Sequence, residues 1–153
     1  MMNEEKFMKQ ALKEAKKAYD ELEIPVGAVI VKDGKIIARA HNQKEKKQDT
    51  TKHAEISAIQ KASKKLNNWR LNDCDMYVTL EPCAMCAGAI VNSRIRKVYI
   101  GAQDEKTGAC GSKLNLLQDF NFDTRVEVET DIMQEECQQM LKQFFKEIRK
   151  MKK

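Results

Sequence analysis

Two short motifs constrain the fold of this chain more than any other feature. His53-Ala54-Glu55 lies upstream of Pro82-Cys83-Ala84-Met85-Cys86. One histidine and two cysteines supply three ligands for zinc, and a catalytic zinc needs that number because its fourth position stays open for water. Glu55 lies two residues from the histidine, where its carboxylate can carry protons to and from that water. The fold must therefore bring the two motifs together.

The alternatives for this motif are a structural zinc site and a redox pair, because both also use C-x-x-C. A redox pair does not require an upstream His-x-Glu. A structural zinc needs a fourth ligand. The remaining cysteines and histidine stand alone in the sequence: Cys74, Cys110, Cys137 and His41. We therefore predict one catalytic zinc per chain, held by His53, Cys83 and Cys86, with Glu55 as a proton shuttle outside the ligand set.

Length and composition predict one domain and no membrane segment. The chain has 153 residues, 42% of them hydrophobic, so residues 1–153 are expected to form a single domain with a sizeable core. No stretch approaches the ~20 apolar residues that span a bilayer, and the start of the chain lacks a signal-peptide pattern. Five cysteines are an odd number, which fits a reducing compartment. We expect a cytoplasmic protein.

The basic residues favour a polyanionic substrate. The net charge of +5 and the pI near 8.9 permit nucleic-acid binding without requiring it. Lysine runs more often form a solvated face than a binding patch. Here two of three clusters lie close in sequence to the metal motifs, which favours binding. The clusters are Lys44, Lys46, Lys47 and Lys52, then Arg94, Arg96 and Lys97, then Lys142, Lys146, Arg149, Lys150, Lys152 and Lys153.

Hydrophobic periodicity predicts alternating helices and strands. We expect a first helix with its apolar face from Phe7 to Leu22, and a strand pair joined by a turn at Asp33-Gly34. A helix from His53 should bury Ile56, Ile59 and Ala62. The other predicted elements are strands 26–31, 36–40, 75–80, 97–101 and 125–128, a helix over 83–92 and a last helix from Met133 to Ile148. This pattern predicts an α/β fold, a three-layer α/β/α sandwich around a five-stranded mixed sheet.

The motifs also predict how the site is built. Pro82 suits a helix start, and Cys83 and Cys86 then share one face of the first turn. Positive partial charge at a helix N-terminus favours thiolates, the form that binds metal. His53 and Glu55 lie two residues apart, on nearly opposite sides of a helix, so they can share a site only beyond the helix end. We therefore expect two helix N-termini to face one zinc.

The sequence resembles the bacterial tRNA-specific adenosine deaminases over nearly its whole length. The most specific match is Tyr77–Ile90, with further matches at His53–Ile56, Asn68–Leu71 and Lys106–Ser112. His-x-Glu followed by Pro-Cys-x-x-Cys is the signature of zinc-dependent nucleobase deaminases. The resemblance implies a cytidine-deaminase-like fold, a homodimer, and conversion of adenosine to inosine at the wobble position of a tRNA anticodon, with release of ammonia.

The resemblance also assigns residues that bind the substrate. By analogy, Asn42 would hydrogen-bond the base edge, the backbone N–H of Ala54 would position the base, and Asp104 would lie where the anticodon loop backbone approaches. The chain departs from the family pattern at Lys52 and Asn92. Both departures concern loop contacts and specificity, and neither touches the zinc chemistry.

Two other classes of protein share part of this pattern. A deaminase of a free base or nucleoside, such as guanine or cytosine, carries the same two motifs, although the 106–112 loop and the basic clusters favour RNA. A non-catalytic, zinc-stabilised RNA-binding module would have no use for Glu55 as a proton shuttle.

Overall fold

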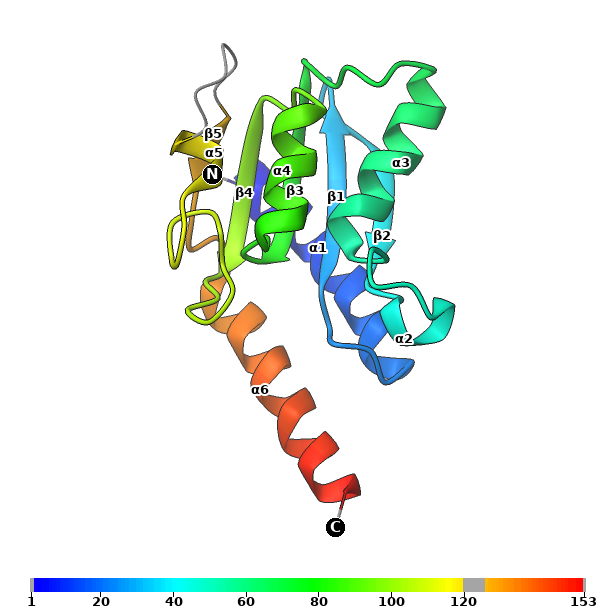
Figure 1. Cartoon of the computed structure of the whole chain (residues 1–153), viewed down its shortest axis with the longest axis vertical. Coiled ribbons are helices and arrows are strands. Elements are labelled where there is room, and N and C mark those ends of the chain that lie inside the picture. The colour runs from blue at the N-terminus through cyan, green and yellow to red at the C-terminus, as the bar shows by residue number, and fades with distance from the viewer. Residues whose placement is uncertain (1, 120–125, 153) are drawn as a thin grey trace.

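The computed structural model describes residues 2–119 and 126–152, which form a single mixed sheet with helices on both faces (Figure 1). The strand order is β2-β1-β3-β4-β5. β1 pairs antiparallel with β2 and β3, whereas β3, β4 and β5 run parallel. The strands are β1 (Gly27–Lys32), β2 (Lys35–His41), β3 (Cys74–Leu80), β4 (Lys97–Ala102) and β5 (Glu127–Glu129). The predicted five-stranded mixed sheet is confirmed.

Helices cover both faces of the sheet, as the predicted three-layer sandwich requires. α3 (Ala54–Leu66) and α4 (Ala84–Asn92) pack on one face, and α1 (Met2–Asp20) and α6 (Gln134–Met151) on the other (Figure 1). Each face has its own cluster of buried apolar side chains. Two short helices, α2 (Lys44–Lys47) and α5 (Leu116–Asp119), lie in segments for which the sequence predicted no helix or strand.

Close packing of helices on the sheet depends on two glycines. A Cβ at Gly27 of β1 would overlap backbone atoms of Ala11 and Ala15 in α1. A Cβ at Gly101 of β4 would overlap the Cys137 sulfur of α6. Only glycine allows backbones and side chains to approach this closely. These positions therefore set the depth at which α1 and α6 sit on the sheet.

Three sequence expectations differ from the structure. α3 buries Ala54, Ala58 and Ala62, while Ile56 is only half-buried and lies outside both core clusters. Small side chains at a spacing of four let α3 approach the sheet closely. Leu22, placed on the buried face of the first helix, follows the helix end and is 56% exposed. The fifth strand begins at Glu127, and Arg125, its predicted start, lies outside the described residues.

Several segments of the chain meet at one end of the sheet. β3 ends at Leu80 and leads through Glu81 and Pro82 to the start of α4, and α3 begins at the same end (Figure 1). α6 projects beyond the sheet in this direction. Within the described residues, no helix is long and apolar enough to cross a membrane.

Candidate active site

The two motifs meet at this end of the sheet, at the N-termini of two helices. His53 is the N-cap of α3 and Cys83 is the N-cap of α4, and both have extended backbone angles. The imidazole Nδ1 of His53 lies 3.8 Å from the Cys83 sulfur and 3.6 Å from the Cys86 sulfur. The predicted geometry, with two helix ends facing one point, is confirmed for these three side chains.

The three donor atoms form a group that a cation would stabilise. The Cys86 thiol, and next His53, lower the pKa of Cys83 to about 4. Cys83 and burial in turn raise the pKa of Cys86. One thiolate therefore opposes ionisation of the other, and both sulfurs can be thiolates together only beside a positive charge.

The spacing and number of donors fit zinc. Zn–N and Zn–S bonds of roughly 2.0–2.3 Å at tetrahedral angles separate two ligand atoms by about 3.6 Å. The two measured separations from Nδ1, 3.6 and 3.8 Å, agree with this value. Among the described residues, His53, Cys83 and Cys86 are the one group with such convergent donors. Cys110 instead contacts the Pro82 carbonyl, and His41 lies between Glu14 and Glu21.

Glu55 lies in the first turn of α3 and is almost completely buried, with 4% exposure. Burial raises the pKa of its carboxyl group to about 7, and the positive charge of His53 acts in the opposite direction. The side chains of Glu55 and Cys86 interact directly. Glu55 therefore lies beside the donor group and can exchange a proton near neutral pH.

Ala54 directly follows His53, and a backbone hydrogen bond joins the segment that carries Asn42 to the segment before His53. The Gln43 N–H donates to the Lys52 carbonyl at 2.9 Å, which joins the segment after β2 to the segment before His53. The Asn42 amide donates to the Ile24 carbonyl and accepts from the Lys44 N–H, both at 3.3 Å. Ala54 is the first residue of α3, so its N–H has no carbonyl partner one turn earlier in the helix.

Asp104 lies in the loop after β4 and organises a tight turn. Its carboxylate accepts hydrogen bonds from the backbone of Lys106 and from the backbone and hydroxyl of Thr107, at 2.7 to 3.1 Å. Burial opposes ionisation, but these hydrogen bonds outweigh it and lower the pKa of Asp104. Asp104 and Thr107 border a groove of about 590 Å³ whose other wall includes Leu141, Lys142 and Phe145 of α6.

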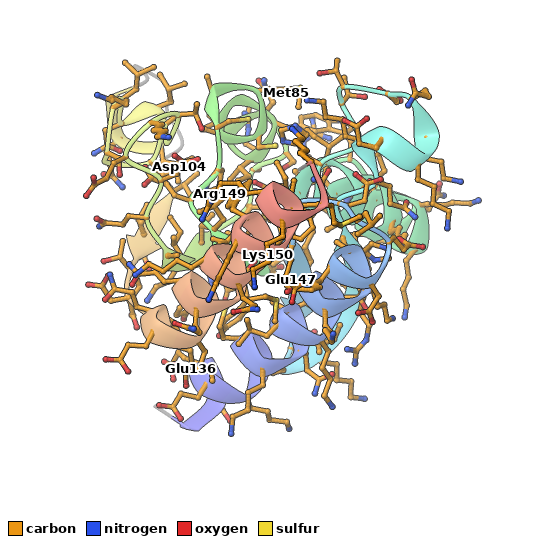
Figure 2. The ribbon with its side chains drawn as sticks, turned by 90° about the horizontal axis from the view of Figure 1, so that it is seen from below. Met85, Asp104, Glu136, Glu147, Arg149 and Lys150 are labelled. Atoms are coloured by element: carbon orange, nitrogen blue, oxygen red, sulfur yellow. The ribbon has the colours of Figure 1, made fainter. Side chains whose placement is uncertain are left out.

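The structure separates the basic clusters that sequence distance had placed together. Arg94 follows the C-terminal end of α4, so the length of that helix, roughly 13 Å, separates it from Cys83. Arg96 pairs with Asp75. The basic residues of α2 and of the last turns of α6 lie towards the same end as the site. Figure 2, which looks onto this end, shows Arg149 and Lys150 together with Asp104 and Met85.

Sequence reasoning missed the buried carboxylate of Glu81. It lies next to Pro82, and it accepts hydrogen bonds from the backbone of Asp104, Cys110 and Ser112. A lone glutamate between a strand and a helix has no periodic signature of burial. Its position immediately before the cysteine motif was the only available signal.

The fold and the donor group define a deaminase with the cytidine-deaminase-like fold. The family described as MafB19-like deaminase matches residues 2–149. A solved structure from a study of A-to-I editing by tRNA:A34 deaminases at the wobble position of transfer RNA superposes with a TM-score of 0.86 and 43% identity, covering 89% of this chain and 99% of that chain. The guanine deaminase of Bacillus subtilis superposes with a TM-score of 0.63 and 44% identity, but covers 65% of this chain and 64% of that chain.

Sequence relatives are similar over their full length. The tRNA-specific adenosine deaminase of Bacillus subtilis is 52% identical over 153 residues, which are 100% of this chain and 95% of that protein. The tRNA-specific adenosine deaminase of Aquifex aeolicus is 47% identical over 148 residues, 97% of each. The chain belongs to the tRNA-specific adenosine deaminase family.

Proposed function

We propose that this protein hydrolytically deaminates adenosine to inosine at the wobble position of a tRNA anticodon. The observation that carries the proposal is the meeting of His53, Cys83 and Cys86 beside the buried Glu55, in a chain that matches tRNA-specific adenosine deaminases from end to end. The donors suit zinc, one ion per chain, with His53, Cys83 and Cys86 as its ligands. When bound, zinc supplies the Lewis acidity that makes water a nucleophile at neutral pH.

Glu55 moves the protons of the reaction. Its raised pKa, about 7, lets the carboxylate take a proton from water and the resulting acid deliver that proton to a ring nitrogen of adenine. The nucleophile adds to the carbon that carries the amino group. Glu55, ionised again after it has protonated the ring, then takes the proton of the newly added hydroxyl group and delivers it to the departing nitrogen, so that ammonia leaves as the carbonyl forms. Because Glu55 must exchange protons in each step, it is assigned as a shuttle and not as a ligand.

Three further residues are proposed to bind the substrate. Asn42 offers its amide to the edge of the flipped base, and the Ala54 N–H lies at the same helix end as His53. Asp104 lies at the border of the groove that continues towards α6, where the anticodon loop backbone would approach. The exposed lysines of α2 and the basic end of α6 supply positive charge for phosphates on this side.

Three further properties are proposed: the domain organisation, the oligomeric state and the location in the cell. We propose that residues 1–153 act as a single domain, that the protein is a homodimer holding the anticodon loop across both subunits, and that it works in the cytoplasm, where tRNA is found. The free-base alternative is not favoured. The guanine deaminase that is 44% identical matches 65% of this chain, and a guanine deaminase that superposes on 92% of it is only 21% identical. The tRNA deaminases are 52% and 47% identical over 100% and 97% of the chain.

The function is tested by sequencing cDNA from an anticodon stem-loop incubated with the protein, because inosine reads as guanosine. Competition with free adenosine, guanine and cytosine distinguishes an RNA substrate from a small one. Metal analysis should find one zinc per chain, lost when His53, Cys83 or Cys86 is replaced by alanine. A fourth protein ligand at Cys74, Cys110 or His41 would exclude the catalytic site.

A further inference from the structure

Glu81 connects the cysteine motif to the loop that carries Asp104. It lies between β3 and Pro82 and is 4% exposed. We propose that Glu81 is a positioning residue: its carboxylate fixes the loop of residues 103–112 (the Asp104 loop) against the cysteine motif and so places Asp104 for the substrate. This role rests on the tRNA deaminase function proposed above.

Both oxygens of the Glu81 carboxylate are used by the Asp104 loop. Oε1 accepts the backbone N–H of Asp104 at 3.0 Å and the hydroxyl of Ser112. Oε2 accepts the backbone N–H of Cys110 at 2.9 Å and that of Ser112 at 3.0 Å. The four donors come from both ends of the loop, and hydrogen bonds to a charged acceptor are roughly twice as strong as neutral ones. One side chain thereby closes the loop.

Backbone hydrogen bonds within residues 104–116 shape the Asp104 loop, but few join it to the cysteine motif. The Gly108 N–H donates to the Asp104 carbonyl and the Leu116 N–H to the Ala109 carbonyl, both at 2.8 Å, and Cys110 forms a bridge with Asn115. Towards the cysteine motif, the Ala109 N–H donates to the Pro82 carbonyl at 2.9 Å. A Cβ at Gly108 would overlap the Asp104 carbonyl and the Glu81 carboxylate. The loop is therefore packed directly onto Glu81, with room only for glycine at the point of contact.

Asp104 is held from two directions. Its N–H bonds to Glu81, while its carboxylate bonds to Lys106 and Thr107 within the turn. The second set keeps the turn intact but does not fix its position on the protein. Without Glu81, the turn keeps its internal bonds and the Ala109 N–H bond to Pro82, but the backbone of Asp104 loses its bond to Glu81 and can shift. Displacing a binding group by about 1 Å can cost about 100-fold in reaction efficiency.

Glu81→Gln tests the role with little change in shape. Glutamine keeps one acceptor oxygen, but its NH₂ group faces backbone N–H donors. We expect zinc content equal to wild type, a KM for the anticodon stem-loop raised about 10-fold to 100-fold, and a kcat changed by less than about threefold. Amide hydrogen exchange should show that Asp104, Cys110 and Ser112 lose protection, whereas the amides of β4 keep theirs.

Two variants check the direction of the effect. Gly108→Ala pushes the loop away from Glu81 and should reproduce both the KM rise and the loss of protection. Asp75→Asn changes another carboxylate of β3, at the opposite end of the strand, where it bonds Arg96. It should leave KM and the loop amides unchanged. If Glu81→Gln does not fold, Gly108→Ala and Ser112→Ala carry the test, with the smaller effect expected for Ser112→Ala because it removes one donor of four.

The proposal is overturned if Glu81→Gln leaves the three loop amides protected, or if it loses zinc while KM stays unchanged. A change of equal size in Asp75→Asn would also overturn it. If the wild-type protein does not deaminate the stem-loop, the proposed function fails, but hydrogen exchange still decides whether Glu81 fixes the loop.

Discussion

The Glu55 carboxylate is subject to two opposing demands. Its burial disfavours the charged form and raises its pKa to about 7, whereas its proposed role beside His53, Cys83 and Cys86 requires a base that can lose its proton. A carboxyl group in water, with a pKa near 4.3, would be a poor acid at neutral pH. Burial thus brings the proton affinity of Glu55 close to the working pH, where a shuttle is most effective.

Replacing Glu55 should separate chemistry from binding. Glu55→Gln and Glu55→Ala should lower kcat by at least about 100-fold, because general acid–base catalysis contributes that much or more. Zinc content and stem-loop affinity should stay near wild type, since Glu55 is outside the proposed ligand set. Stem-loop deamination, metal analysis and a binding titration measure the three effects. Substantial turnover, or loss of zinc, would contradict the assignment.

The raised pKa of Glu55 also predicts a pH dependence of stability in zinc-stripped protein. The folded state keeps a proton that the unfolded chain releases between its ordinary pKa of 4.5 and the folded value of about 7. The folded state thus binds more protons in this window, so the free energy of unfolding falls as pH rises. Glu55→Gln should remove this fall and be more stable than wild type above pH 7, by up to about 3 kcal/mol. Urea unfolding of both zinc-stripped proteins at pH 5 and pH 8 measures the difference in their free energy of unfolding. Equal stability at pH 8 would contradict the prediction, because it would show that neighbouring groups stabilise the ionised Glu55 carboxylate.

At the scale of elements, the sequence predicted local structure and, through the paired motifs, the meeting of His53 with Cys83 and Cys86, but it missed other contacts between distant segments. Pro82 and the spacing of Cys83 and Cys86 specify a helix start, and the structure has it there. The bonds of Glu81 to the Asp104 loop join residues up to 31 positions apart, and no local pattern encodes them. Arg94 was misplaced for the same reason, because closeness in sequence says nothing about which end of a helix faces the site.

Close packing of α1 on the sheet can be tested at Gly27. Gly27→Ala should lower the free energy of unfolding by about 1–3 kcal/mol, because the new methyl group would overlap backbone atoms of α1. Gly88→Ala is the matched control, since a Cβ at Gly88 of α4 meets no atom within 4 Å. Alanine should stabilise that helix by up to about 1 kcal/mol. Denaturant unfolding compares the two, and equal effects would contradict the packing account.

At the scale of the whole molecule, one end of the sheet collects the parts that a tRNA anticodon would need. The proposed metal ligands and Glu55 lie in the first turns of α3 and α4, and the Asp104 loop bonds to Glu81 and Pro82 just before Cys83. α6 projects beyond the same end (Figure 1), and Figure 2 shows Arg149 and Lys150 on it. The residues proposed for chemistry and those proposed for phosphate binding thus lie in different segments, so separate substitutions can test the two roles.

Lys46 and Lys47 of α2 are expected to contact phosphates. Replacing both with alanine should weaken stem-loop binding. It should also reduce the slope of log affinity against log salt by about 1 to 2, because fewer phosphate contacts form and binding therefore releases fewer counterions. Lys46 also pairs with Glu21 at 2.7 Å, so its replacement leaves the Glu21 carboxylate without this partner. The negative charge of Glu21 then weakens stem-loop binding further. The rate at saturating substrate should change little.

Asn42→Ala should give the opposite pattern, with kcat lowered by about tenfold and a nearly unchanged salt slope, because its amide is proposed to act on the base and carries no charge. Lys64→Ala with Lys65→Ala is the matched control: these lysines lie in the last turn of α3, about 15 Å or more along the helix from His53, and should change neither quantity. Binding titrations at several salt concentrations, with single-turnover rates, distinguish the three variants. An unchanged slope in the Lys46 and Lys47 variant would show that α2 is only a solvated face. If, in addition, the protein deaminated free nucleosides, the substrate would be a small molecule and not tRNA, and the deaminase chemistry assigned to Glu55 would still stand.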